Sequence, residues 1–281
     1  MMQPRRQFRS LSQWFQFCIV LAFSVIVLVP IGAVFYYAFV PTTTLATGGQ
    51  LLYRNLDLSN FQYVLNQTNM LLYLRNSIIV TVATATFAVV FGAPAAYAMS
   101  RSPRRSISAY SFLLFVAQAL PIIIFLIPLF ILFRPLGLVD SLAGVFVIYL
   151  AASLPFSCWM LRTTFDAIPV ELEEAAWLDG NTIVGGFIGV VLRNAGPGIL
   201  SVWLFSFLLA WNDYLVAVVF LHSDSVLTMP VGLQSFFQQY STEWGAVMAS
   251  AMLMLLPPVI VFSVLHRYFR VGGVAGSLAG T

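Results

Sequence analysis

The chain has 281 residues, of which 60% are hydrophobic and 8% are charged, and its mean hydropathy is +0.92. Soluble domains carry about a quarter of their residues as charges, so this composition excludes an ordinary soluble protein. The two cysteines, Cys18 and Cys158, both fall in apolar runs, and the two histidines lie far apart in the sequence. Neither a disulfide framework nor a metal site is therefore expected.

Long apolar runs predict the architecture. A helix needs about 20 mainly apolar residues to cross a bilayer. The runs in this chain predict an all-α, polytopic membrane protein with six transmembrane helices, near residues 14–40, 76–100, 106–133, 141–161, 194–221 and 244–266. The membrane domain then covers 14–268, between an N-terminal segment 1–13 and a C-terminal tail 269–281.

The distribution of arginine predicts the orientation, because cytoplasmic loops accumulate positive charge. Arginines gather before the first helix, between the second and third, and after the sixth: Arg5, Arg6, Arg9, Arg101, Arg104, Arg105, Arg267 and Arg270. Both chain ends are thus expected in the cytoplasm. The pair in "PRRQF" also fits a twin-arginine export signal, but the apolar run that follows is too long for one. We expect a membrane anchor.

The segments between the predicted helices differ in composition. On the outer side, Ser59 or Asn60 can cap a short surface helix. The segment 222–243, also outside, is rich in glutamine and aromatic residues. The cytoplasmic segment 162–193 is unusual because it holds five of the ten acidic residues of the chain.

The stretch "ELEEAAWLDG", which begins at Glu171, concentrates this acidity. A catalytic carboxylate cluster, a metal site or a docking surface would each use such residues. Catalysis needs a buried, shaped site, and the segment has no histidine, cysteine or nucleophile motif. The chain also has no phosphate-binding loop, so we expect no ATP hydrolysis by it alone.

Interpreted as a helix, the stretch favours docking to a protein. Pro169 suits the first helical position, and Asp179-Gly180 ends the helix where a positive φ is favoured. Leu172, Ala175 and Ala176 share a narrow face with Asp179. Helices that lie on a membrane usually carry Lys and Arg on their polar face, whereas this one is acidic.

The same residues resemble a known motif. Glu174-Ala175-Ala176, followed after three residues by Gly180, is similar to the EAA loop of binding-protein-dependent ABC importer permeases. The Ile-x-Leu-Pro ending of that loop departs from pattern here, with Val190, Leu192 and Arg193 in its place. The segments "RNSIIVTVATATFAVVFGAPAAYAMSR", "IPLFILFRPLGLVDS", "FLLAWNDYLV" and "MPVGLQSFFQQYSTEWG" resemble the carbohydrate-uptake subgroup, and most of all the smaller permease of maltose-like transporters.

This resemblance implies a non-catalytic permease subunit in a bacterial plasma membrane. Its partners would be a second permease, an ABC ATPase dimer that uses ATP and Mg²⁺, an external sugar-binding protein or lipoprotein, and membrane lipid, but no nucleic acid. The chain itself would bind no cofactor. The acidic helix would couple to the ATPase through Glu171, Glu173, Glu174, Ala175, Ala176, Asp179 and Gly180.

Three further regions are candidates, the first because a carboxylate at membrane depth is costly and suggests function. The fifth helix would line the translocation path with Trp203, Trp211, Asn212 and Asp213, although a packing contact explains Asp213 equally well. The outer loop would contact the binding protein through Gln234, Gln238, Gln239 and Tyr240. The glycine-rich tail would either reach between the ATPases or be a disordered end.

Other transporter classes are less consistent with the sequence. A secondary transporter needs ion-coupling residues near the bilayer centre, and only Asp213 qualifies. A passive channel has no need of an acidic docking segment. Within the ABC class, a non-sugar solute or a phosphorylated polyol remains the alternative to a sugar.

Overall fold

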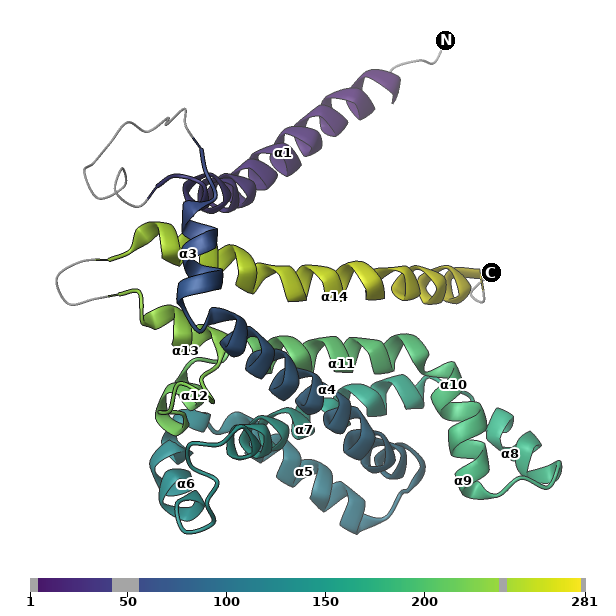
Figure 1. Cartoon of the computed structure of the whole chain (residues 1–281). Helices are drawn as coiled ribbons and strands as arrows, with labels where there is room; N and C mark the ends of the chain where they lie inside the picture. The colour runs from purple at the N-terminus through teal and green to yellow at the C-terminus, as the bar shows by residue number, and fades with distance from the viewer. Residues whose placement is uncertain (1–4, 42–55, 238–241, 279–281) are drawn as a thin grey trace. The chain divides into compact units, whose positions relative to one another are not determined.

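The computed structural model describes residues 5–41, 56–237 and 242–278. Within these ranges the chain is helical and has no strand beyond a single bridge between Phe237 and Thr242. The helices are α1 Arg5–Ala38, α3 Ser59–Gln67, α4 Met70–Arg101, α5 Arg105–Ala119, α6 Leu126–Phe133, α7 Leu142–Asp166, α8 Glu171–Leu178, α9 Ile183–Gly186, α10 Leu192–Asn194, α11 Gly196–Trp211, α12 Leu215–Phe220, α13 Met229–Gln234 and α14 Trp244–Leu278 (Figure 1). A 3₁₀ turn (Ile122–Phe125) precedes α6, and a π-helical turn (Phe187–Val191) follows α9.

The chain divides into two compact units, which are residues 1–68 with 235–254, and residues 69–234 with 255–281. In the first unit, the Asn60 amide donates hydrogen bonds to the carbonyls of Ala38 (3.0 Å) and Val40 (2.7 Å), which fastens α3 to the end of α1. The carboxylate of Asp57 accepts the backbone N–H of Ser59 at 2.9 Å. The predicted short helix near residue 59 is present, but Leu58 occupies its N-cap position, so neither Ser59 nor Asn60 caps it as predicted.

In the second unit, α4, α7 and α11 pack side by side (Figure 1). Small residues of α4 allow this close approach. Ala93 and Ala96 lie in one buried cluster with larger apolar side chains of the neighbouring helices, Leu161, Phe165 and Val202. An ideal Cβ built at Gly92 would lie 3.3 Å from the Cβ of Ser157, so α4 and α7 touch almost backbone to backbone.

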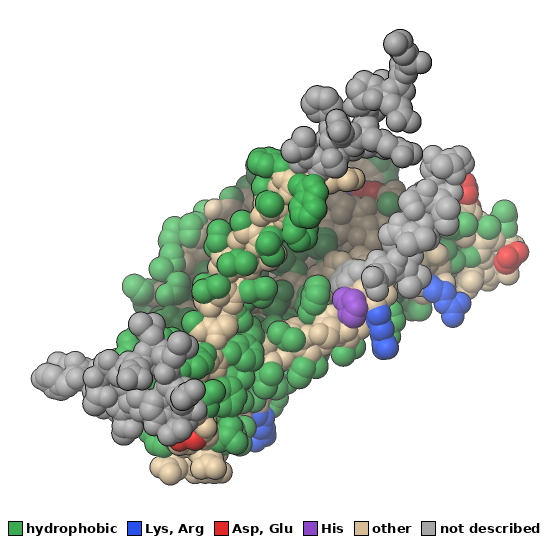
Figure 2. Space-filling view, turned by 90° about the horizontal axis from the view of Figure 1, so that it is seen from above, with side chains coloured by type: hydrophobic (Ala, Val, Ile, Leu, Met, Phe, Trp, Pro, Cys, Tyr) green, Lys and Arg blue, Asp and Glu red, His purple; other side chains and the backbone are tan. Residues whose placement is uncertain are grey.

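Hydrophobic side chains also cover much of the surface, and charged ones are confined to a few places on the face that Figure 2 shows. Exposed apolar faces of this kind are typical of helices in lipid. Among the described residues, four helices are long and apolar enough to cross a membrane, and the number rises to as many as six if each of two bent helix pairs forms one span. The prediction of an all-α polytopic protein is thus confirmed.

Besides shifts of several residues at the ends of other helices, the structure differs from the predicted helices at three points. The helix expected over 106–133 is broken at Leu120-Pro121, where α5 and the Ile122–Phe133 segment meet at 87°. The helix expected over 194–221 ends at Trp211, and α12 begins at Leu215. The segment 162–193 is mostly helical. Its last helical stretch, Ile183–Asn194, meets α11 at an angle of 78°, with the bend at Ala195-Gly196. Proline explains the first break, because it has no N–H to continue the helix.

Candidate functional site

Helix α8 lies at one end of the second unit, together with α9 and α10, while α6 and α12 lie at the opposite end (Figure 1). We call these the α8 end and the loop end. Gly180 terminates α8 with a φ of +88°, as its position after Asp179 predicts. The N–H of Gly180 bonds to the Trp177 carbonyl and that of Asn181 to the Ala176 carbonyl, both at 3.0 Å. This is the Schellman pattern, in which a left-handed residue satisfies the last carbonyls of a helix. The helix begins at Glu171, two residues after Pro169.

Most of α8 is exposed. The side chains on the face that points away from the rest of the unit are apolar, small or acidic, namely Glu171, Leu172, Glu174, Ala175, Leu178 and Asp179. Leu178 is 89% exposed, an extreme value for a leucine beside a turn. Apolar side chains displayed in this way are typical of protein contact surfaces. Ala176 is half-buried.

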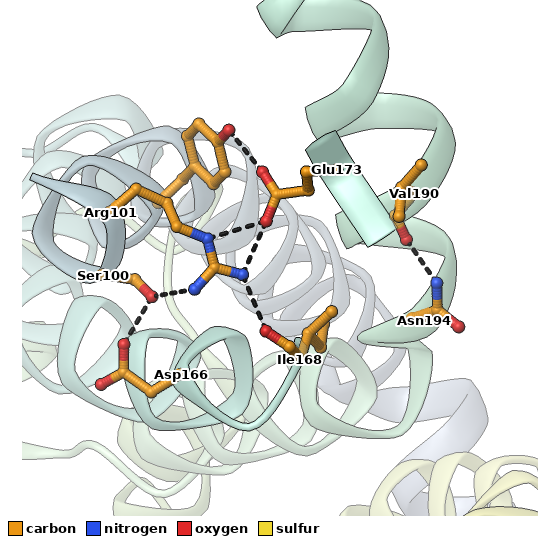
Figure 3. Close-up of polar contacts among 8 residues, drawn as sticks. Ser100, Arg101, Asp166, Ile168, Glu173, Val190 and Asn194 are labelled. Atoms are coloured by element: carbon orange, nitrogen blue, oxygen red, sulfur yellow. Dashed lines mark hydrogen bonds and ion pairs between the residues drawn. The ribbon is translucent and has the colours of Figure 1, made fainter. Parts of the chain in front are cut away.

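Glu173 differs from its neighbours because its side chain is completely buried inside the chain (Figure 3). Its Oε1 accepts a hydrogen bond from Arg101 Nε at 2.7 Å and lies 2.6 Å from Arg101 Nη2. Its Oε2 accepts the hydroxyl hydrogen of Tyr97 at 2.6 Å. The expectation that Glu173 flanks a partner-facing surface does not fit this placement. Removing one partner from a buried ion pair typically costs about 3–5 kcal/mol.

The helix after α8 packs tightly against it. A Cβ built at Gly186 in α9 would lie 2.8 Å from the indole nitrogen of Trp177, so glycine is needed for this approach. Thr182 caps α9 by accepting the N–H of Gly185 at 3.0 Å. The α8 helix and the short helix that follows therefore form one compact hairpin with an outward acidic and apolar face.

The candidate path residues of α11 have different environments. Trp211 is only 2% exposed and stacks on Phe207, with ring centroids 5.6 Å apart. Trp203 is half-buried, and its indole N–H donates to Thr86 at 3.2 Å. Asn212 is exposed. None of these residues is among those that line an apolar cavity of about 550 Å³ between α5, α6, α7 and α11.

Asp213 has internal partners that explain its position. One carboxylate oxygen accepts the N–H groups of Val216 (3.0 Å) and Ala217 (3.3 Å), which are the first free donors of α12. The same oxygen accepts the hydroxyl hydrogen of Tyr149 at 2.8 Å. Aspartate is a favoured cap at such a helix start. The geometry therefore favours the packing interpretation of Asp213 over contact with a substrate.

The loop end holds the segment 221–234 from two sides. From α4, the Asn76 amide donates to the carbonyls of Ser225 (3.0 Å) and Leu227 (2.9 Å), and Ser77 Oγ accepts the N–H of Met229 at 2.7 Å. A third residue of α4, Tyr73, donates its hydroxyl hydrogen to the Asp224 carboxylate at 3.3 Å.

Asp140, in the turn between α6 and α7, holds the same segment from the other side. Its carboxylate accepts the N–H groups of His222 (2.8 Å) and Ser223 (2.9 Å) and the Ser223 hydroxyl hydrogen. The Ser223 hydroxyl and these two N–H groups lower the pKa of Asp140 to about 2. Asp140 has a φ of +56°, a conformation that aspartate tolerates better than most residues.

The candidates for contact with a binding protein are only partly described. Gln234 is exposed at the end of α13. Gln238, Gln239 and Tyr240 lie outside the described residues. The sequence pattern did not indicate that Leu178, Arg101, Tyr97 and Asp140 take part in these two ends. An apolar residue before Asp-Gly in an acidic helix was a usable signal for Leu178, whereas the others depend on contacts between distant parts of the chain.

The sequence is similar to those of known membrane transport proteins. A family model described as "Binding-protein-dependent transport system inner membrane component" matches residues 88–270, more than half of the chain. The inner membrane ABC transporter permease protein YcjP of Escherichia coli K12 is 35% identical over 211 residues, covering 74% of each chain. The trehalose transport system permease protein SugB of Mycobacterium tuberculosis is 30% identical over 257 residues, which are 90% of this chain and 93% of SugB.

Solved structures show the same fold. One chain of a bacterial ABC transporter involved in the import of the acidic polysaccharide alginate superimposes with a TM-score of 0.81 at 23% identity, covering 96% of this chain and all of that one. A chain of the MetNI methionine ABC transporter gives a TM-score of 0.59 at 17% identity and covers 72% of this chain. At these identities the likeness shows the fold alone.

Proposed function

Since this chain belongs to the family of binding-protein-dependent transport system inner membrane components, and is thus a non-catalytic permease subunit of an ABC transporter, we propose that it serves the uptake of a sugar or oligosaccharide. Relatives named for trehalose and diacetylchitobiose uptake, each matching about nine tenths of this chain, support a carbohydrate substrate. A phosphorylated polyol or another solute is the alternative.

The arginine-rich α8 end lies in the cytoplasm in this proposal, with both chain termini, and the loop end lies outside. An ABC ATPase dimer binds ATP and Mg²⁺ and docks on α8, while this chain binds no cofactor. A second permease completes the pore, and an external binding protein delivers the solute to the loop end. The protein is then a multi-pass component of a bacterial plasma membrane.

The outward face of α8 is the observation that carries the ATPase contact. Leu178 supplies an apolar anchor, Ala175 leaves room for close approach, and Glu174 supplies charge for a basic partner residue. The carboxylates thus serve docking rather than catalysis or metal binding. Transport follows when ATP-driven closure of the ATPases displaces α8 and switches the pore from inward-facing to outward-facing. The C-terminal tail is a second candidate for contact with the ATPases.

For the translocation path we propose Trp203 and Asn212, which keep exposed surface, ahead of Trp211, which is buried, and Asp213, whose carboxylate is bound by Tyr149 and by the start of α12. For the binding protein we propose the segment that starts at Gln234. Gln238, Gln239 and Tyr240 follow it directly in the sequence.

The test is Leu178→Asp in the assembled transporter. A charge in place of this exposed apolar anchor should cost about 2 kcal/mol or more of binding, so the ATPase subunits should be lost during co-purification and uptake into vesicles should fall below detection. Leu136→Asp is the matched control, because Leu136 is 62% exposed in the turn between α6 and α7 at the opposite end. It should retain the ATPases. Normal co-purification and uptake by Leu178→Asp would show that α8 is not the docking element.

A further inference from the structure

We propose that Glu173, Arg101 and Tyr97 form an internal clamp that makes α8 and α4 move together, so that displacement of α8 by the ATPase reaches the membrane helices. Arg101 and Glu173 are then positioning residues and do not touch the ATPase. The proposal rests on the proposed docking of the ATPase to α8, and it goes further by naming how the movement is transmitted.

The first step is that Glu173 has no free capacity for an outside partner. Its side chain is fully buried, and both of its oxygens are occupied by residues of the same helix, α4. A carboxylate that docked to another protein would need an exposed oxygen, as Glu174 on the outward face has. Adjacent glutamates of α8 thus face opposite ways, one into the chain and one away from it.

The second step concerns Arg101, which joins three elements through one rigid group (Figure 3). Besides Glu173 in α8, its guanidinium donates to the carbonyl of Ile168, between α7 and α8, at 3.0 Å. It also donates to Ser100 Oγ at 3.0 Å, and Ser100 donates to Asp166 at the end of α7. The planar guanidinium fork fixes these directions in a way that a lysine ammonium cannot.

Tyr97 provides the second attachment. It lies four residues before Arg101, so both side chains leave α4 on the same face. Its hydroxyl binds Glu173, and its ring packs against Phe187 in the π-helical turn, with centroids 4.7 Å apart. The clamp therefore holds the start of α8 and the chain that follows α9 against the same turn of α4.

These contacts make sliding of α8 over α4 unfavourable. Separating the pair would leave the buried Glu173 carboxylate without its partner, and the Arg101 guanidinium, whose side chain is 15% exposed, would lose its counter-charge. Because α4 packs along both α7 and α11, a push on α8 would pass to all three helices.

The test uses the complete transporter in proteoliposomes and measures solute uptake per ATP hydrolysed. Arg101→Glu and Glu173→Arg should each lower this ratio by about tenfold or more, because each places two like charges in a buried pair. The ATPase subunits should still co-purify, since the outward face of α8 is unchanged. The double variant that exchanges the two charges should restore at least part of the ratio.

Arg105→Glu is the matched control, because Arg105 is an exposed arginine at the start of α5, four residues after Arg101 in the sequence. It should transport normally. Arg101→Lys and Tyr97→Phe should give intermediate ratios, since each retains part of the contacts. If charge reversal prevents insertion, Glu173→Gln preserves the shape without the charge and should insert while still lowering the ratio.

Three results would overturn the clamp: wild-type ratios in both single reversals, a charge exchange no better than either single variant, or a wild-type ratio in an inserted Glu173→Gln protein. These failures are distinct from failure of the docking proposal. If Leu178→Asp releases the ATPases while the clamp variants transport normally, only the clamp is wrong. If Leu178→Asp has no effect, the docking proposal is wrong.

Discussion

The two ends of the second unit hold their functional segments by different physical means. At the α8 end, one buried ion pair and one tyrosine attach a short helix whose other face stays exposed. At the loop end, residues 222–229 are held mainly through backbone groups, by uncharged side chains of α4 and by the Asp140 carboxylate. The first arrangement concentrates the attachment in one contact, and the second distributes it.

This difference predicts how each end responds to substitution. A single buried charge pair fails as a whole when one member is removed, because the remaining charge loses its partner. Several neutral hydrogen bonds contribute roughly 0.5–1.5 kcal/mol each, so the loss of one leaves the rest in place. Substitutions at the α8 end should therefore lower transport by about tenfold or more, whereas those at the loop end should reduce it in smaller steps.

After Leu178→Asp, the largest effect in this comparison is expected from Gly180→Val, which tests the exposed side of the α8 end. Valine at a φ of +88° should cost about 1–2 kcal/mol and disrupt the cap that ends α8. No heavy atom lies within 4 Å of a Cβ built there, so the effect comes from backbone conformation and not from a clash. We expect uptake into vesicles to fall by about tenfold, with normal membrane insertion.

Gly180→Asn is the control for this substitution, because asparagine tolerates the left-handed conformation. It should retain most of the uptake. Equal losses in the asparagine and valine variants would point to a need for glycine itself at the partner surface, and normal uptake by both would mean that the cap is not required.

The contrast between the ends also explains what the sequence could and could not predict. The Asp-Gly end of α8 was predictable because it depends on local backbone conformation. The burial of Glu173 was not, since it depends on Arg101, which lies 72 residues away in the sequence. In an acidic stretch, a glutamate beside other glutamates is most simply interpreted as exposed.

The membrane helices show the same limit. Their existence followed from hydropathy, which needs no knowledge of neighbours, and Pro121 was a visible signal for the break between α5 and α6. Asp213 carried a local signal as well, because aspartate often caps a following helix. Its hydrogen bond to Tyr149, by contrast, required the packing of α7 against α11. Local signals in the sequence were sufficient to predict the helices. They were not sufficient to predict the contacts between the helices.

A moderate effect is expected from Asn76→Ala at the loop end. The substitution removes two hydrogen bonds to the Ser225 and Leu227 carbonyls, at about 0.5–1.5 kcal/mol each. The segment before Gln234 should then be less well ordered for the binding protein. We expect several-fold more loaded binding protein to be needed for half-maximal stimulation of ATP hydrolysis, with unchanged co-purification of the ATPases.

Asn194→Ala is the control, because the Asn194 amide bonds only to the Val190 carbonyl of its own helical segment. It should leave the titration curve unchanged. An Asn76→Ala transporter with a wild-type curve would show that the α4 contacts do not order the part of the loop that the binding protein uses.

The smallest effect is expected at Asp140, which is half-buried and shares its role with the α4 contacts. Its pKa is lowered to about 2 from an ordinary value of 3.8 by the Ser223 hydroxyl and by the N–H groups of Ser223 and His222. A lowered pKa means that the ionised form stabilises the fold. That contribution is complete above about pH 4 and is lost as the pH falls toward 2. Asp140→Asn preserves an acceptor and tolerates the φ of +56°, but it has no charge to titrate.

The melting temperature of the wild-type protein in detergent should therefore fall more steeply between pH 4 and pH 2.5 than that of Asp140→Asn, while the two curves run parallel above pH 5. Other carboxylates titrate in the same range, so the difference between the two curves is the informative quantity. Asp140→Ala, which loses every acceptor and places a less tolerant residue at positive φ, should be the least stable of the three at neutral pH. If the wild-type and Asp140→Asn curves stay parallel down to pH 2.5, the ionised carboxylate does not hold the loop, and the α4 side chains alone account for its order.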